Sequence, residues 1–292
     1  MFRKAQRKKA KLRLGLAGPA GSGKTYSALL IAFGLGGKVA MLDTEHGSGE
    51  LYANLGDYDV ATLSPPFSPD RYVKIIREAE KEGYNVLIID SISHAWAGEG
   101  GILEMHDKYA KTKGNSFTAW REVTPTHNAL VEAMLQSEMH IIATMRSKQE
   151  YIMTTDDKGK TAIKKVGMAP IQRDGMEYEF TLFLELSLEH YAMATKDRTS
   201  LFDGRPPFVI TVETGKTLLE WLEEGIDPVA ESQKAMQVLL ERIERIANVF
   251  ELKNWYKKHA SEISALIPAH QKEVISACTK KRAGLEEQAK TA

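Results

Sequence analysis

The sequence of 292 residues is 43% hydrophobic, which is enough for one large buried core and a smaller appended module. Lysine plus arginine and aspartate plus glutamate both total 39, so any nucleic-acid binding must come from local patches rather than from net charge. The single cysteine, Cys278, excludes an internal disulfide and favours a reducing, cytoplasmic setting. No apolar run approaches the ~20 residues that span a bilayer, so no membrane partner is expected.

The chain divides by pattern into three parts. Residues 1–10 form a basic arm, which either contacts phosphates or is disordered. Residues 11–225 alternate short apolar runs with helical segments, which is typical of a core of the α/β class. In residues 226–292 apolar side chains recur at helical spacing, which predicts a small C-terminal helical module with a frayed tail after Arg282.

The expected strands of the core are apolar throughout rather than alternating, as in a mostly parallel sheet that helices cover on both faces. In chain order they are residues 12–17, 38–43, 86–90, 140–144, 180–186, 191–195 and 208–212. A short turn joins 180–186 to 191–195 and predicts an antiparallel extension of the sheet. The expected helices are residues 25–35, 70–82, with Ser68 as N-cap, and 216–225.

A phosphate-binding loop is predicted at residues 18–25, GPAGSGKT, which fit the pattern G-x-x-x-x-G-K-[ST] between a strand and a helix. Glycines let backbone N–H groups converge on phosphate oxygens, and the helix N-terminus adds a favourable dipole. Lys24 is expected to reach the β- and γ-phosphates of ATP, and the Thr25 hydroxyl to coordinate Mg²⁺. The alternative is a chance glycine-rich turn. The predicted nucleotide-binding residues are Gly18, Pro19, Ala20, Gly21, Ser22, Gly23, Lys24, Thr25 and Tyr26.

Two strand ends carry candidate catalytic carboxylates. Asp90 ends the apolar strand YNVLIID, which places it to hold the Mg²⁺ shell beside the phosphate loop. Glu45 follows the strand after the phosphate-loop helix, and ligands of parallel sheets bind beyond the carboxyl ends of the strands. Glu45 is therefore a candidate to orient or deprotonate the attacking water, or else it caps a loop or pairs with a lysine. No N-K-x-D guanine-specificity motif is present, which argues against a GTPase.

Two insertions mix cations with aromatic residues, the combination that tracks phosphates and stacks on bases of single-stranded DNA. The first spans residues 106–123 and the second residues 146–170, where DDKGK predicts a hairpin turn. The alternative for both is a solvated hairpin or a packed helix, with Trp120 buried. The candidate DNA-binding residues are Lys111, Lys113, Trp120, Arg121, Arg146, Lys148, Lys158, Lys160, Lys164 and Lys165.

The segment MLDTEHGSGELYA resembles bacterial RecA, in which a strand ends in Asp-x-Glu-His and a Tyr-Ala follows. The resemblance implies that Glu45 activates water and that Tyr52 stacks on adenine. IIATMRSK is similar to the RecA strand that ends in a polar sensor of the γ-phosphate and precedes a DNA-binding loop, which places Thr144 at the sensor position. Lys196 and Arg198 in ATKDRTS resemble the Lys-x-Arg finger that RecA-like and DnaB-like ATPases extend to a neighbouring subunit, unless they are a solvated surface pair.

The core as a whole is similar to the phage RecA-like annealing and recombination ATPases of the Sak-four family. The strings that carry this similarity are GPAGSGKT, DTEHG, IIDSIS, MRSK, RDGMEYEF and KDRTSLF. The resemblance implies DNA-stimulated ATP hydrolysis, single-stranded DNA binding, strand annealing, a homo-oligomer in a ring or filament, cooperation with a single-strand-binding protein, and the cytoplasm of a bacterial host. The alternatives are a DnaB-like hexameric motor or helicase, and a nucleotide-switched DNA-binding scaffold that hydrolyses ATP weakly.

Overall fold

The computed structural model describes residues 4–155 and 161–291. The chain forms two compact units, Lys11–Leu222 and a second unit that joins the first ten residues to Glu223–Ala292. The basic arm expected to stand by itself therefore belongs to the helical unit. The Lys9 amide donates to the Ile226 carbonyl at 3.0 Å, and the Ile226 amide donates to the Arg7 carbonyl at 3.0 Å.

The first unit contains an α/β sheet whose strands run in the order β3-β2-β4-β5-β1-β7-β8-β9. The strands from β3 to β7 in this order are parallel, and β8 and β9 extend the sheet in the antiparallel sense. This confirms the predicted fold class. The strands are β1 Arg13–Gly18, β2 Val39–Asp43, β3 Asp59–Thr62, β4 Val86–Asp90, β5 His140–Thr155, β7 Leu182–Leu186, β8 Tyr191–Asp197 and β9 Phe208–Val209.

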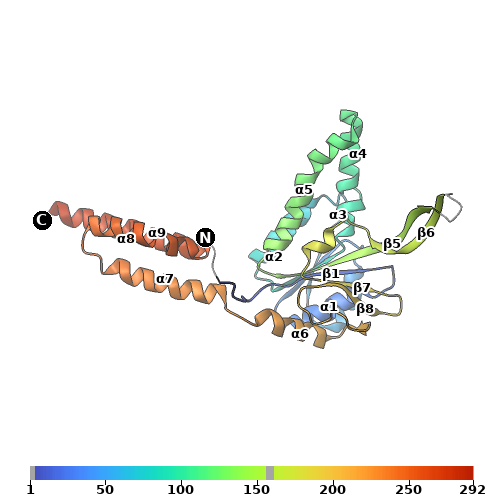
Figure 1. The fold of residues 1–292 in the computed structure, drawn as a ribbon, viewed down its shortest axis with the longest axis horizontal. Helices are drawn as coiled ribbons and strands as arrows, with labels where there is room; N and C mark the ends of the chain where they lie inside the picture. The colour runs from blue at the N-terminus through green and yellow to red at the C-terminus, as the bar shows by residue number, and fades with distance from the viewer. Residues whose placement is uncertain (1–3, 156–160, 292) are drawn as a thin grey trace. The chain divides into compact units, whose positions relative to one another are not determined.

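Helices cover both faces of this sheet (Figure 1). Helices α1 (Lys24–Leu35) and α6 (Val212–Glu223) lie on one face, and α2 (Pro69–Lys81), α3 (Ser93–Ala97) and α5 (Ser116–Gln136) lie on the other. Successive strand residues point to opposite faces. Alternate residues of the central strands therefore join two separate cores, which explains why these strands are apolar throughout.

The two insertions form projecting hairpins (Figure 1). The first consists of α4 (Ile102–Lys113) and α5, and the Asn115 side chain caps α5 by accepting from the Phe117 amide at 2.8 Å. In the second, β5 continues far beyond its expected end at residue 144 and pairs with β6 (Thr161–Pro170). Pairing with β6 lengthens β5. The periodicity within β5 does not reveal this longer strand, because its partner lies after the turn.

Three further boundaries differ from the expected ones. Strand β9 ends at Val209, and α6 begins at Val212 because the Thr214 hydroxyl accepts from the Thr211 amide at 3.1 Å and closes a turn there. Strand β7 begins at Leu182, two residues later than expected. The last helix continues to Thr291 instead of fraying after Arg282, since Leu285 packs in the core of the helical unit.

The helical unit contains α7 (Pro228–Glu244), α8 (Val249–Ala265) and α9 (Pro268–Thr291). The Asp227 and Asn248 side chains cap the first two of these helices. The apolar residues at helical spacing meet in one cluster that includes Met236, Leu239, Ile243, Ile246, Leu252, Ile263, Leu266 and Val274. None of the described helices is long and apolar enough to cross a lipid bilayer.

Candidate active site

The phosphate-binding loop connects β1 to α1 as its pattern predicts. Gly21 and Gly23 both have φ of 81°, a left-handed backbone conformation that residues other than glycine rarely adopt. The Lys24 ammonium donates to the Gly18 carbonyl at 3.0 Å and to the Pro19 carbonyl at 2.8 Å. The Ser22 hydroxyl is buried, and the part of the chain that the structure describes offers it no hydrogen-bond partner. A buried polar atom without a partner and a lysine beside it fit a phosphate ligand.

Asp90 and Thr25 lie where an Mg²⁺ ion would bind beside the phosphates. The Thr25 hydroxyl donates to Asp90 Oδ2 at 2.5 Å, and the Thr144 hydroxyl donates to Asp90 Oδ1 at 2.5 Å. Burial raises the pKa of Asp90, and the charges of Glu45 and Asp43 add to this rise although the two threonines oppose it. Among the described residues no cluster of three His, Cys, Asp or Glu side chains could hold a metal. The Thr25 hydroxyl and the Asp90 carboxylate fit Mg²⁺, which is commonly held by one or two protein oxygens plus phosphate and water.

Thr144, the predicted phosphate sensor, lies beside Asp90. The residue is fully buried, and its hydroxyl donates to Asp90. Its backbone carbonyl accepts from the Ile92 amide at 3.1 Å, which ties β5 to the segment after β4. The role of Thr144 at the γ-phosphate stays a prediction.

The two acids that follow β2 have different surroundings. Asp43 is fully buried and accepts from the amide of Glu45 at 2.5 Å and from that of Gly49 at 3.0 Å, so it shapes the loop. The side chain of Glu45 is 20% exposed and lies near Lys24. Burial lowers the pKa of Lys24, and the charge of Glu45 opposes this shift. The Ser91 hydroxyl, directly after Asp90, donates to Glu45 Oε1 at 3.2 Å. Of these two acids, Glu45 is thus the one that lies beside Lys24 and the segment of Asp90.

Arg146 forms an ion pair with Glu45, although the sequence suggested that it contacts DNA. Its Nε donates to Glu45 Oε1 at 2.8 Å, and its Nη2 donates to Oε2. Burial favours the protonated carboxyl and is the largest single influence on the pKa of Glu45. Arg146, helped by His94 and Ser91, outweighs burial and holds that pKa below its ordinary value. No sequence pattern pointed to this pair, because the two residues meet through the order of the strands in the sheet.

A cavity of 550 Å³ beside the phosphate loop fits a nucleoside. Tyr26 of α1 and Tyr52 of the 3₁₀ helix η1 (Ser48–Leu55) line it, and their ring centroids are 6.1 Å apart at an interplanar angle of 66°. His190, from the turn between β7 and β8, completes a wall of the cavity. Its Nδ1 lies 3.1 Å from the position that a Cβ on Gly23 would take, so its ring packs directly on the loop. No sequence pattern pointed to His190.

Lys196 and Arg198 lie away from the phosphate loop of their own chain. In the register of the sheet, Lys196 pairs with Phe183 of β7, and Phe183 pairs with Gly15 of β1. The phosphate loop begins at the end of β1, Gly18. Lys196 is therefore level with the middle of β1 and two strands away from it, and Arg198 lies two residues further along the chain.

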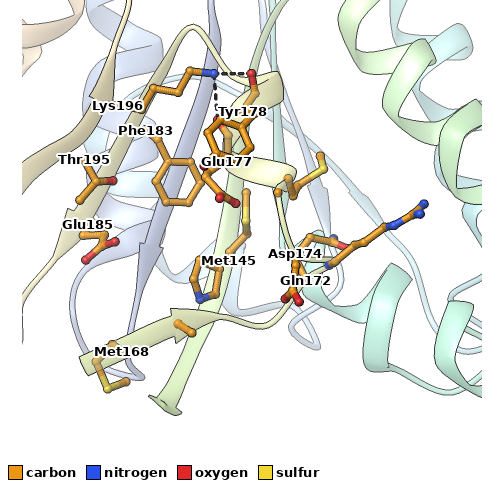
Figure 2. Close-up of a pocket in the computed structure, with 15 residues that line it drawn as sticks. Met145, Met168, Gln172, Asp174, Glu177, Tyr178, Phe183, Glu185, Thr195 and Lys196 are labelled. Atoms are coloured by element: carbon orange, nitrogen blue, oxygen red, sulfur yellow. Dashed lines mark hydrogen bonds between the residues drawn. The ribbon is translucent and has the colours of Figure 1, made fainter. Parts of the chain in front are cut away.

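Lys196 and Arg198 both contact a short 3₁₀ helix, η2 (Met176–Glu179). The Lys196 ammonium donates to the carbonyls of Glu177, at 3.1 Å, and Tyr178, and it borders a cavity of 580 Å³ (Figure 2). Arg198 donates to the Tyr178 carbonyl at 3.1 Å. Burial and the nearby Arg198 lower the pKa of Lys196. Both cations donate to backbone carbonyls in these hydrogen bonds, and the charges of Glu179 and Glu177 oppose the lowering of the Lys196 pKa.

The α4–α5 hairpin separates its aromatic residues into a packed set and an exposed set. Trp120 stacks on His106 at 4.2 Å and on Trp96 at 5.9 Å between centroids, which supports the packing interpretation for this residue. Phe117 is 74% exposed, and the Arg121 guanidinium lies 6.0 Å from its ring centroid. Trp120 is thus held within the hairpin, whereas Phe117 and Arg121 remain available to a partner.

Several candidate DNA-binding lysines have only partial structural context. Lys111 on α4 and Lys148 on β5 are exposed. Lys158 and Lys160 lie outside the described residues. For three others the structure describes the backbone alone: Lys113, Lys164 and Lys165.

The phosphate loop, the two strand-end acids and the parallel sheet have a counterpart among known families. The model of a family described as an AAA domain matches residues 10–209, which is more than half of the chain and contains all of these features. No curated protein matches the chain. Membership of this family implies nucleotide binding and ATPase activity. The chain therefore belongs to the AAA domain family of P-loop NTPases.

Proposed function

We propose that this protein is a DNA-stimulated ATPase that binds single-stranded DNA and promotes strand annealing or homologous recombination, as its resemblance to the phage Sak-four family implies. Its substrates are ATP with Mg²⁺ and single-stranded DNA, and it works as a homo-oligomer in cooperation with a single-strand-binding protein. The observation that carries the proposal is the position of Glu45. The charge of this acid acts on Lys24 of the phosphate loop, and its carboxylate pairs with Arg146 at the base of a projecting hairpin.

The chain's own residues account for the hydrolytic step. Lys24 lies on the phosphate loop and would exchange its two carbonyl partners for β- and γ-phosphate oxygens. Glu45, once free of Arg146, would accept a proton from the attacking water, so that ATP and water yield ADP and phosphate. Thr25 and Asp90 would hold Mg²⁺, which when bound neutralises charge that develops on the phosphate oxygens.

The location of Lys196 and Arg198 supports a site shared between subunits. Because Lys196 lies on β8 and Arg198 directly after it, two strands away from β1, neither residue is adjacent to the phosphate loop of its own chain. Each donates to a backbone carbonyl, and the charges of Glu177 and Glu179 act on Lys196, so a phosphate of a neighbouring subunit would replace these partners. Cations placed at the transferring phosphate stabilise the transition state.

Two projecting hairpins support DNA binding. The tip of the α4–α5 hairpin exposes Phe117 beside Arg121, and Lys111 is exposed on α4 of the same hairpin. Stacking of one base on an exposed ring stabilises a complex by about 1–3 kcal/mol, and cations hold the adjacent phosphates. The β5–β6 hairpin begins directly after Arg146 and carries Lys148 near its base. Each hairpin thus has the chemistry of a single-strand site.

The test is ATP turnover measured with no DNA, with single-stranded DNA and with duplex DNA, alongside annealing of complementary strands. We expect stimulation by single strands and ATP-dependent annealing. Lys24→Ala should lose about 100-fold or more of turnover, because the phosphate charge then lacks its main counter-ion. Lys216→Ala, on an exposed face of α6, is the control and should match the wild type. The proposal is contradicted if DNA leaves the rate of ATP turnover unchanged, or if an enzyme that hydrolyses ATP does not anneal complementary strands.

The Arg146–Glu45 pair also favours a second candidate, a nucleotide-switched DNA-binding scaffold with weak hydrolysis. A base held in an ion pair is a poor proton acceptor, so such a protein would bind ATP long before it hydrolyses it. Single-turnover measurements separate the two candidates: a scaffold keeps DNA bound with intact ATP for many minutes, whereas an annealing ATPase turns over repeatedly. Directional unwinding of a forked duplex would instead favour a hexameric motor.

A further inference from the structure

The contact between Arg146 and Glu45 joins a predicted DNA-binding residue to the predicted acceptor of the water proton. The guanidinium binds both carboxylate oxygens, and Ser91 shares one of them. Two parallel N–H···O bonds fix the carboxylate in direction as well as in place. A water molecule that needs a proton acceptor must compete with these donors. In the arrangement observed, Glu45 is therefore restrained.

The pair also makes Glu45 a weaker base. Burial favours protonation of this carboxyl, but the hydrogen bonds and charge of Arg146 reverse the balance and lower its pKa. A general base works best when its pKa is near the working pH. Removal of the guanidinium would leave burial as the dominant influence, which would bring the pKa of Glu45 up and improve it as a proton acceptor.

Arg146 stands at the junction between the ATPase sheet and the β5–β6 hairpin. It is the last residue of β5 that pairs with β1, opposite Gly18, and Ser147 is the first that pairs with β6, opposite Pro170. Its backbone amide donates to the Ser93 hydroxyl at 3.0 Å, so the main chain is anchored. The side chain of Arg146 is 47% exposed, whereas that of Glu45 is 20% exposed, so solvent reaches this ion pair from the arginine side. A phosphate that arrives from solvent can therefore reach the guanidinium and compete with the carboxylate for it.

Resting on the proposed function, we infer that Arg146 is a positioning residue that restrains Glu45 until single-stranded DNA binds. Lys148, two residues further on, projects from the same side of the strand and would bring a DNA phosphate to the base of the hairpin. A phosphate binds arginine in the same two-bonded manner as a carboxylate and can take the guanidinium from Glu45. The freed carboxylate then accepts the proton from water, which links DNA binding to hydrolysis.

The experiment compares turnover with and without an oligothymidylate strand in the full chain. Arg146→Ala should raise the DNA-free rate about fivefold, the factor expected when a half-exposed ion pair is opened, and should bring the stimulation by DNA close to none. Arg77→Ala is the matched control. Arg77 is 50% exposed and pairs with Glu80 at 2.8 Å on α2, remote in sequence from both hairpins, and its loss should change neither rate.

Two further readouts separate positioning from a structural role. The acid limb of the pH–rate profile should move to higher pH in Arg146→Ala, because the charge that lowers the pKa of Glu45 is gone. The double variant Arg146→Ala with Glu45→Gln should be as inactive as Glu45→Gln alone, since Arg146 acts through that carboxylate.

The outcomes also separate this inference from the proposed function. Suppose that DNA stimulates the wild type but Arg146→Ala keeps a low or reduced DNA-free rate in a normally folded chain; then only the restraint is overturned. If DNA leaves the wild-type rate unchanged, both the proposed function and the coupling fail. A raised rate with an unmoved pH profile also rejects the restraint of Glu45 by Arg146.

Discussion

The acids of the core show how surroundings rather than residue type set the role of a carboxylate. Asp43 accepts from two backbone amides and shapes a loop, and Asp90 accepts from two threonines beside the phosphate loop. Glu45 accepts from the guanidinium of Arg146. Glu185 on β7 borders two cavities, and burial is the sole cause that raises its pKa. Each acid therefore responds differently to removal of its charge.

Glu185→Gln should stabilise the protein at neutral pH by about 1–3 °C in melting temperature. Burial raises the folded-state pKa of Glu185 above its ordinary 4.5, so the folded state binds this proton more tightly than the unfolded state does. The resulting destabilisation is absent below about pH 4.5 and grows as pH rises through the folded pKa. The gain from glutamine should therefore be seen at pH 7 and disappear at pH 4.

Thermal melts of the wild type, Glu185→Gln and Glu220→Gln at both pH values provide the check. Glu220 is exposed on α6, and its amide variant should melt like the wild type. An equal gain at both pH values would show that shape, and not charge, explains the effect.

At the scale of elements, α1 and α6 touch through their backbones. A Cβ on Gly34 would lie 2.2 Å from the Val212 carbonyl oxygen, and one on Gly215 would lie 2.3 Å from the Ile31 carbonyl oxygen. Both obstacles are backbone atoms, which cannot move aside as a side chain can. Since α1 begins at the phosphate loop, this close contact also helps to hold that loop in position.

Gly34→Ala should lower the free energy of unfolding by about 1–3 kcal/mol, the usual result of overfilling a packed contact. Gly284→Ala in α9 is the control, because nothing lies within 4 Å of its added Cβ. Alanine is a better helix former than glycine, so this control should be neutral or more stable by up to about 1 kcal/mol. Denaturant titrations of both variants decide the matter, and an unchanged midpoint for Gly34→Ala contradicts the packing argument.

At the scale of the whole molecule, the two compact units have separate cores. The core of the helical unit contains no residue of the ATPase unit. The basic arm belongs to the helical unit, where Arg7 pairs with Glu224 at 2.6 Å and Lys9 with Glu223 at 2.5 Å. These carboxylates offset part of the arm's charge, so the hairpins are the better candidates for DNA contact.

Mixing two inactive variants should restore activity if the finger acts between subunits. Arg198→Ala retains the base, and Glu45→Gln retains the finger, so a mixed oligomer contains interfaces in which both are intact. Random equimolar assembly makes roughly a quarter of the sites complete, which predicts about that share of wild-type turnover. ATP hydrolysis across a series of mixing ratios is the measurement. A rate that equals the weighted mean of the two pure variants would place Arg198 in the site of its own chain.

The phosphate loop, Asp90, the parallel sheet and the helical module could be predicted without a structure. Each depends on residues that are near one another in the chain: a glycine-rich turn before Lys24, a continuous apolar run before Asp90, or apolar side chains at helical spacing. The place of Glu45 directly after a strand marked it as a candidate on the same local basis, and the resemblance to RecA added Tyr52. Local order is enough for these features because the chemistry and the pattern share one segment.

Folding alone brought together the groups that are far apart in the chain. Arg146 and Glu45 are 101 residues apart, and they meet because β2, which precedes Glu45, and β5, which carries Arg146, lie on either side of β4 in the sheet. His190 packs on Gly23 because β7 lies beside β1, and Trp120 is held by stacking on Trp96 and His106. Strand order and register decide these contacts, since they result from burying both faces of the sheet at once. No short segment of sequence carries that information.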